Sequence, residues 1–157
     1  MRVVVPVLPP FWAGHSEAAS SAGAAAGARA VIGRHLAGWG LQSLTDDALL
    51  VVTELLVNAV RYGKPPWNIS MWLMSREGGR RYVRLEVADA GAGIDINLIR
   101  ARWRHPSSSL MDGGRGLFIV DTLASSWGNG HSSHGHTVWA ELEVEPDAPG
   151  GGPPPSG

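Results

Sequence analysis

The chain contains no cysteine, a single lysine (Lys64) and no apolar run long enough to cross a bilayer. The lack of cysteine excludes a disulfide framework, a thiolate nucleophile and a zinc–thiolate site. A membrane-spanning helix needs about 20 mostly apolar residues, and the proline-broken start MRVVVPVLPPFW is a poor signal peptide. A formal net charge of −1 gives no general reason to expect nucleic acid or an anionic membrane as a partner. We therefore expect a cytoplasmic protein that binds neither directly.

The 157 residues are enough for one domain with a sizeable hydrophobic core. We expect that domain to cover residues 1–145. Residues 146–157, PDAPGGGPPPSG, combine proline and glycine with almost no apolar side chains. We expect this tail to be disordered, because it has too little apolar surface to bury.

The hydrophobic pattern predicts helices beside a sheet. The expected strands are 3–8 at an edge, 67–75, 80–89 and 136–145, and the expected helices are about 16–37, 45–62, a short one after 95, and 115–124. Glu77-Gly78-Gly79 is typical of a hairpin turn between two of these strands. The predicted fold class is therefore α+β: a two-layer α/β sandwich with a mixed, mostly antiparallel sheet and helices on one face.

One predicted helix carries two polar groups on an otherwise apolar segment. Residues 49–61 read LLVVTELLVNAVR, and Glu54 and Asn58 lie four apart, so they share one face of the helix. A carboxylate beside so much apolar surface is costly unless something pairs with it. An acid and an amide aimed at one place indicate a metal-ligand and proton-transfer site. The alternative is that both cap a neighbouring element or reach solvent along a polar edge.

Two glycine-rich stretches follow. The alternating strand 82–89 ends in Asp89 and the turn Asp-Ala-Gly-Ala-Gly, and residues 112–120, DGGRGLFIV, place three glycines before an apolar helical run. Glycine lets a ligand approach the backbone closely, and free amides at a helix start favour an anion. Each motif alone is weak, and no Walker A sequence is present. The ordered set of four motifs, which closes with Gly-His-Thr-Val-Trp at 135–139, is specific.

This order resembles the GHKL (Bergerat-fold) ATP-binding family, and within it the small anti-sigma factor serine/threonine kinases of high-GC Gram-positive bacteria. The resemblance covers about residues 16–145 and implies ATP and Mg2+ as cofactors. It implies that Glu54 is the general base, that Asn58 coordinates Mg2+, and that Asp89 accepts the adenine amino group. It further implies that Gly91 and Gly93 shape the adenine pocket, that Thr137 supports Asp89 through water, and that the phosphate loop consists of Gly113, Gly114, Arg115, Gly116 and Leu117. The chemistry agrees, since a carboxylate accepts from an amine and repels a carbonyl oxygen, and Mg2+ prefers oxygen ligands.

The function that the resemblance implies is transfer of the ATP γ-phosphate to a serine of an antagonist protein, in a switch that also holds a sigma factor. Two departures weigh on the kinase activity: Tyr62 stands where family helices often carry histidine, and Asp112-Gly113 where a basic residue is common. The first alternative is an ATP-binding partner-switching module without transfer. The second is a histidine-kinase-type ATP-binding domain, for which His35 is the only candidate phosphoacceptor. The kinases it resembles dimerise, and the sequence leaves a homodimer open.

Other features allow two interpretations each. His131, His134 and His136 could bind a transition metal, but their spacing matches no standard site, so we expect a solvated hairpin loop. Arg100, Arg102 and Arg104 form a solvated helix face or supply one cation to the γ-phosphate. Trp103 packs in the core or contacts nucleotide or a partner, and the serines 107–109 form a plain loop or a lid over phosphate. Trp72, Trp127 and Trp139 are expected in the core.

Overall fold

The computed structural model covers residues 1–157 and describes residues 3–6, 17–93, 95–103, 115–133 and 135–146. Five strands and four α-helices occupy these ranges. In chain order they are β1 (Val3–Pro6), α1 (Glu17–Gly38), a 3-10 turn (Gln42–Leu44), α2 (Thr45–Tyr62), β2 (Asn68–Ser75), β3 (Arg81–Asp89), α3 (Ile96–Trp103), α4 (Arg115–Leu123), β4 (Ser126–Ser132) and β5 (Gly135–Glu143). Each element predicted from the sequence is present, with its ends within two residues of the expected ones.

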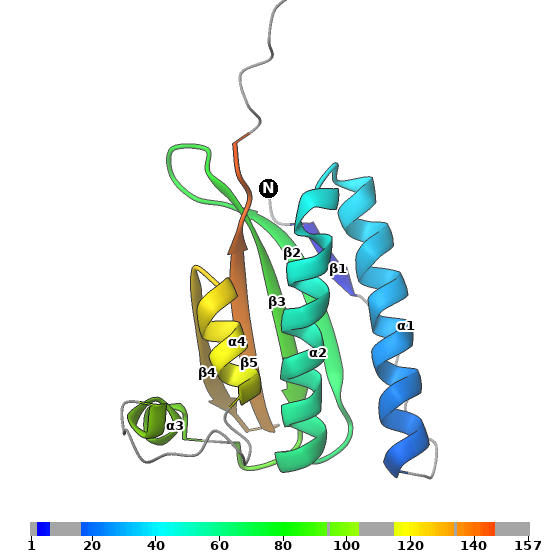
Figure 1. The fold of residues 1–157 in the computed structure, drawn as a ribbon, viewed down its shortest axis with the longest axis vertical. Helices are drawn as coiled ribbons and strands as arrows, with labels where there is room; N and C mark the ends of the chain where they lie inside the picture. The colour runs from blue at the N-terminus through cyan, green and yellow to red at the C-terminus, as the bar shows by residue number, and fades with distance from the viewer. Residues whose placement is uncertain (1–2, 7–16, 94, 104–114, 134, 147–157) are drawn as a thin grey trace, which may run out of the picture.

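The strands form one sheet in the order β1-β2-β3-β5-β4. Every neighbouring pair of described strands is antiparallel, so the sheet is not mixed as the sequence had suggested. Helices α2 and α4 lie across one face of this sheet, and α1 packs beside α2 (Figure 1). The α+β two-layer sandwich is therefore confirmed. No helix in the described part of the chain is both long and apolar enough to span a bilayer.

The core lies between α2 and the inner face of the sheet. On β3, Val83, Leu85 and Val87 are buried and alternate with partly exposed residues, and on α2 Val51 and Leu55 are buried against them. Each such side chain contributes roughly 1.5–3 kcal/mol when it is fully buried. Because side chains alternate along a strand, the next inward position after Val87 is Asp89. The pattern that builds the core thus also carries a carboxylate to the inner face at the end of the strand.

The outer face of the sheet carries aromatic and charged side chains, and none of the described helices packs across it. The Arg84 guanidinium lies 4.2 Å from the centre of the Trp139 ring. Its Nε donates to Glu86 Oε1 at 2.7 Å and its Nη1 to Glu141 Oε1 at 2.8 Å, and Arg76 pairs with the other Glu141 oxygen. Trp72 and Trp139 are only half-buried on this face, whereas Trp127 is buried, so core placement holds for one of the three tryptophans.

Strand β4 was not predicted from the sequence. Its segment, SWGNGHS, contains two glycines and no apolar alternation, and we expected the histidines beyond it to lie in a solvated hairpin loop. Instead β4 pairs with β5 along its whole length, with Gly128 opposite Trp139. A side chain at Gly128 would come within 2.8 Å of the Trp139 ring, so glycine leaves room for the indole. His131 is therefore on an edge strand, and His136 is buried within the sheet.

Candidate functional site

Asp89 ends β3 with a carboxylate that the backbone around it holds in place. The residue is only 6 % exposed. Its Oδ1 accepts the Gly91 N–H at 2.6 Å and the Lys64 N–H at 3.3 Å. A side chain at Gly63 would collide with this carboxylate, and one at Gly91 would come within 2.7 Å of Oδ1. The two glycines are thus needed because the chain passes the acid closely, and Oδ2 is the oxygen left for other partners.

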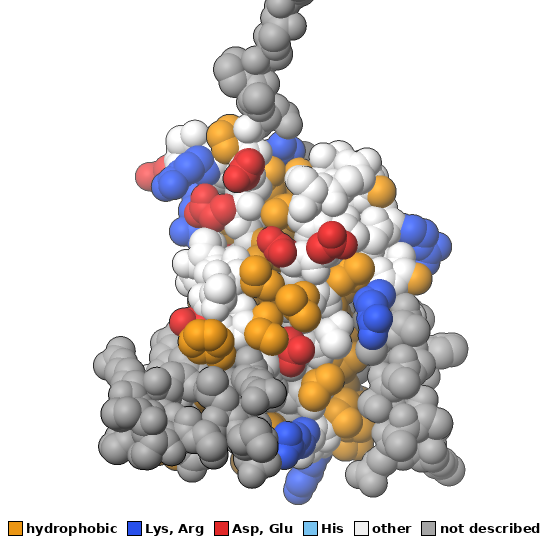
Figure 2. All heavy atoms as spheres, in the orientation of Figure 1, with side chains coloured by type: hydrophobic (Ala, Val, Ile, Leu, Met, Phe, Trp, Pro, Cys, Tyr) orange, Lys and Arg blue, Asp and Glu red, His pale blue; other side chains and the backbone are white. Residues whose placement is uncertain are grey.

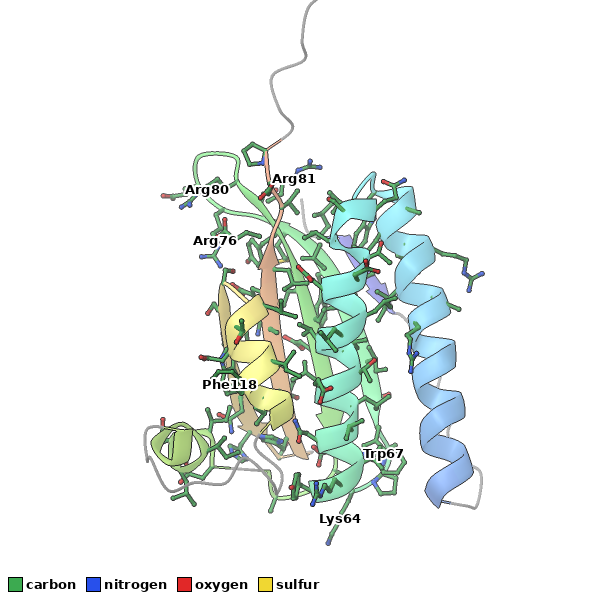
Figure 3. All side chains as sticks on the ribbon, viewed as in Figure 1. Lys64, Trp67, Arg76, Arg80, Arg81 and Phe118 are labelled. Carbon is green, nitrogen blue, oxygen red and sulfur yellow. The ribbon has the colours of Figure 1, made fainter. Side chains whose placement is uncertain are left out.

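The last turn of α2 is held against this end of the sheet. The Trp67 indole N–H donates to the Ala59 carbonyl at 3.1 Å, and the Gly63 N–H donates to the same carbonyl at 2.8 Å. Figure 3 shows Lys64 and Trp67 at the lower end of α2, far from Arg76, Arg80 and Arg81 at the opposite end of the sheet. The site is therefore built at the end of the sheet where β3 finishes and α2 turns into β2.

His136 is a site residue that the sequence analysis did not assign. It pairs directly with Asp89 in the β3–β5 register and is 3 % exposed. Its Nδ1 lies 3.4 Å from Asp89 Oδ2, and its Nε2 lies 3.1 Å from Asn129 Nδ2. Burial lowers the pKa of His136, although the hydrogen bond and charge of Asp89 act against this, and the His131 ring, 4.9 Å away, lowers it further. We therefore treat the imidazole as neutral at pH 7.

The register corrects the role expected for Thr137. This residue pairs with Ala88, and Val138, Ala140 and Leu142 share the buried face with His136. Thr137 therefore lies on the outer face, away from the Asp89 carboxylate. The signal that could have found His136 was the alternation itself: counting back in steps of two from the apolar residues of β5 reaches position 136.

Gly93 closes the glycine turn over the histidine. Its φ of +84° lies in the left-handed region that favours glycine, and a side chain there would collide with the His136 and His131 rings. A small hollow lies beside it, lined by Asn58, Ala59, Tyr62, Gly63, Asp89, Gly93, His136 and Val138. The space open to the centre of a water molecule is about 10 Å³, room for one water. Tyr62, which is 45 % exposed, lies at the outer side of this lining.

Glu54 and Asn58 meet the start of α4, as the sequence predicted for a shared site. A side chain at Gly116 would collide with the Glu54 carboxylate and come within 3.5 Å of Asn58 Nδ2. Asn58 is 9 % exposed, and its Nδ2 is a buried donor with no hydrogen-bond partner among the described residues. Leaving such a donor unpaired costs about 1–3 kcal/mol. The amide is therefore suited to a ligand that enters between α2 and α4.

The remaining predicted residues are only partly placed. Gly116 and Leu117 lie in the first turn of α4, with Leu117 fully buried, and Arg115 begins that helix. Gly113, Gly114, Asp112, Arg104 and the serines 107–109 lie outside the described residues, and the segment with Arg100, Arg102 and Trp103 forms α3.

A histidine metal site gains no support from the structure. Within the described ranges, no three His, Cys, Asp or Glu side chains are grouped to hold a metal ion. His134 lies outside those ranges.

The donor set is suited to a nucleotide. At one end of the sheet, the buried Asp89 carboxylate can accept a hydrogen bond from an amine. On the neighbouring α2, the Glu54 carboxylate and the unpaired Asn58 amide face the start of α4. As placed, Asn58 offers an N–H donor that suits a phosphate oxygen, and helix starts favour phosphate. With the amide turned, its oxygen is a hard ligand of the kind that Mg2+ prefers. The fold and the site thus describe an α+β domain whose donors and acceptors fit a nucleotide.

Residues 18–142 match the family model described as the histidine kinase-like ATPase domain, so the chain belongs to this family. Membership implies ATP binding and confirms the GHKL class inferred from the motifs. No curated protein matches the chain significantly. The likeness to anti-sigma factor kinases stays a prediction.

Proposed function

We propose that the protein is an ATP-dependent serine/threonine kinase of the anti-sigma factor type. It transfers the γ-phosphate of ATP to a serine of an antagonist protein. The observation that carries this proposal is the meeting of Glu54, Asn58 and Gly116, which brings an acid, an unpaired amide and a helix start to one place. A domain that only stored ATP would not need a carboxylate there.

Each residue has a distinct role in the proposed reaction. Asp89 accepts the adenine amine, and the first amides of α4 bind the γ-phosphate. Glu54 takes the proton from the serine hydroxyl while the hydroxyl oxygen forms a bond to the γ-phosphorus. The bond from that phosphorus to the bridging oxygen of ADP breaks in the same step. Asn58, turned so that its amide oxygen faces the phosphates, would hold Mg2+, which neutralises phosphate charge when bound.

An exposed apolar strip beside Glu54 supports a protein substrate. Leu50 and Val57 lie two turns apart on α2 and are 42 % and 50 % exposed, and Phe118 on α4 is 47 % exposed. Figure 2 shows apolar side chains gathered over this face of the molecule. Exposed apolar groups that cluster next to a reacting group are typical of interaction surfaces. We propose that the antagonist serine reaches Glu54 across this strip, and that the same cytoplasmic domain binds a sigma factor.

The second candidate is an ATP-binding partner switch without phosphoryl transfer. The observation that favours it lies in the sequence: Asp112 and Gly113 stand where the kinases of this type often carry a basic residue. Phosphoryl transfer gains from a cation near the γ-phosphate. A histidine-kinase-type role would require a phosphoacceptor, and among the described helices only α1 offers a histidine, His35 in its last turn.

Incubation of the full chain with γ-labelled ATP and the candidate antagonist (anti-anti-sigma) proteins encoded near its gene tests the kinase proposal. We expect acid-stable label on one antagonist and none when Glu54→Gln replaces the unmodified protein. ATP binding without any label transfer would favour the partner switch. Acid-labile label on the chain itself would favour the histidine-kinase type.

A further inference from the structure

At the inner end of the hollow, hydrogen bonds connect three strands in a fixed direction. Asn129 on β4 offers its Nδ2 to His136 Nε2 at 3.1 Å, and His136 Nδ1 faces Asp89 Oδ2 at 3.4 Å. A neutral imidazole carries one proton, and the nitrogen that accepts from an amide N–H cannot be the protonated one. The proton is therefore on Nδ1, and His136 is a donor toward the carboxylate oxygen that the backbone leaves free.

The contact between His136 and Asp89 is weak enough to be shared. A distance of 3.4 Å is beyond the usual 2.7–3.2 Å of an N–H···O hydrogen bond. Asp89 Oδ1, in contrast, already accepts two backbone N–H groups. A ligand at this end of the hollow therefore meets one available acceptor, Asp89 Oδ2, with one available donor, His136 Nδ1–H, directly beside it.

Adenine presents the complementary pair along one edge. Its exocyclic amine is a donor, and the neighbouring ring nitrogen N1 is an acceptor. We propose that His136 is a specificity-determining residue of the nucleotide site, and that its Nδ1–H donates to adenine N1 while Asp89 Oδ2 accepts the adenine amine. The proposal rests on ATP binding at Asp89, and it assigns the second contact to the base, through a tautomer that Asn129 maintains.

Two other donors near the hollow are less suited to this role. Asn58 Nδ2 lies toward Gly116, near the proposed phosphate side. Tyr62 lies at the rim and is 45 % exposed, whereas His136 is buried beside the acid. Tyr62→Phe therefore serves as a matched control, because it removes a donor from the same hollow and leaves the His136–Asp89 pair intact.

The test measures binding of ATP and of 1-deaza-ATP, in which a C–H group replaces N1, by calorimetry on the full chain. The matched variants are His136→Asn, which keeps an amide donor close to the position of Nδ1, and His136→Leu, which has the same shape without a donor. We expect the unmodified protein to prefer ATP by about 3- to 10-fold, the worth of one hydrogen bond. Tyr62→Phe should keep this preference, His136→Asn should keep most of it, and His136→Leu should abolish it.

Three results would overturn the assignment. An equal preference for ATP in the unmodified protein and in His136→Leu would show that another group contacts N1. Loss of the preference in Tyr62→Phe would assign the contact to the tyrosine. Tighter ATP binding by His136→Leu would show that His136 competes with the base for Asp89. Absence of ATP binding by the unmodified chain is a different outcome, since it would overturn the proposed nucleotide site itself.

A second measurement needs no variant and so does not depend on folding of His136→Leu. Nitrogen-15 NMR of histidine side chains in the full chain should show a neutral His136 with its proton on Nδ1. Addition of ATP should shift that Nδ1–H resonance, and 1-deaza-ATP should shift it much less. Equal shifts with both nucleotides, or a proton on Nε2, would contradict the proposal.

Discussion

Replacement of Asp89 by asparagine is expected to weaken ATP binding strongly while the fold persists. Oδ1 accepts two backbone N–H groups, so the variant amide keeps its oxygen on that side and turns its NH2 group toward His136 and the ligand. A donor then faces the adenine amine, where an acceptor is required. Loss of a charge-assisted hydrogen bond costs roughly 1.5–3 kcal/mol, which is about a 10- to 150-fold loss of affinity.

The structure also bounds the effect of Asp89→Asn on stability. The two backbone hydrogen bonds remain, and only the 3.4 Å contact with His136 turns unfavourable. We therefore expect the free energy of unfolding to fall by about 1–3 kcal/mol, the cost of a poorly paired buried group. The assay is calorimetry with ATP and GTP, with a thermal melt of each protein as the control. Unchanged ATP affinity in the variant, or GTP bound as tightly as ATP by the unmodified chain, would refute the placement of adenine at Asp89.

Four further outcomes are expected. Asn58→Ala should remove the Mg2+ dependence of ATP affinity, measured with and without the metal, because the amide joins the metal to the chain. Glu54→Gln should keep ATP affinity within a few-fold and lower phosphoryl transfer by about 10²–10⁴, the usual worth of a positioned base. Gly116→Ala should lower transfer by about 10²-fold, since its methyl group would displace the Glu54 carboxylate. Because burial lowers the pKa of His136, this histidine takes up its proton in the unfolded chain before it does so in the folded protein as pH falls. The free energy of unfolding should therefore decrease below about pH 6.5, by up to about 1.4 kcal/mol per pH unit. His136→Asn should lack this part of the pH dependence.

Each of these outcomes has a result that contradicts it. An undiminished Mg2+ effect in Asn58→Ala would remove that residue from the metal site. Full turnover in Glu54→Gln would make the carboxylate structural, and full turnover in Gly116→Ala would show that the close approach of α4 does not matter. For the pH dependence, denaturant unfolding at pH 7.5 and 5.5 should give a smaller difference for His136→Asn than for the unmodified chain. Equal differences would show that His136 titrates normally.

The sequence predicted the elements whose hydrophobic period is strong. The 18-residue α2, with its buried stripe, begins and ends where the pattern indicated, and so does β3. Strand β4 was not predicted because SWGNGHS has no hydrophobic alternation. This edge strand forms through its pairing with β5, which the local sequence does not show. The position of a side chain on a strand also depends on register, and a shift of one residue moves it to the other face. This is why a threonine was expected beside Asp89 and the neighbouring histidine lies there.

Within the site, the sequence could predict only those neighbours whose spacing along one helix brings them together. Glu54 and Asn58 share a helix face whatever the rest of the chain does. The close approach of Gly116 to them, and of Gly63 to Asp89, depends on how α4 and the α2–β2 connection are placed. No local pattern records those tertiary distances. The sequence indicated Gly116 as a permissive position and did not indicate Gly63, and the contacts of both became known only from the fold.

Side chains cover the outer face of the sheet. Arg84 covers the Trp139 ring, and Glu86 and Glu141 anchor that arginine. Among the described residues, long side chains therefore cover this face where other folds place a layer of helices. Such a cover is held by charge as well as by contact. Dissolved ions screen the partly exposed Arg84–Glu86 pair more than the Arg84–Glu141 pair, whose carboxylate is buried. Salt should therefore loosen this face before it disturbs the α2 side, and a dye that binds exposed aromatic surface would report that loosening in the intact protein.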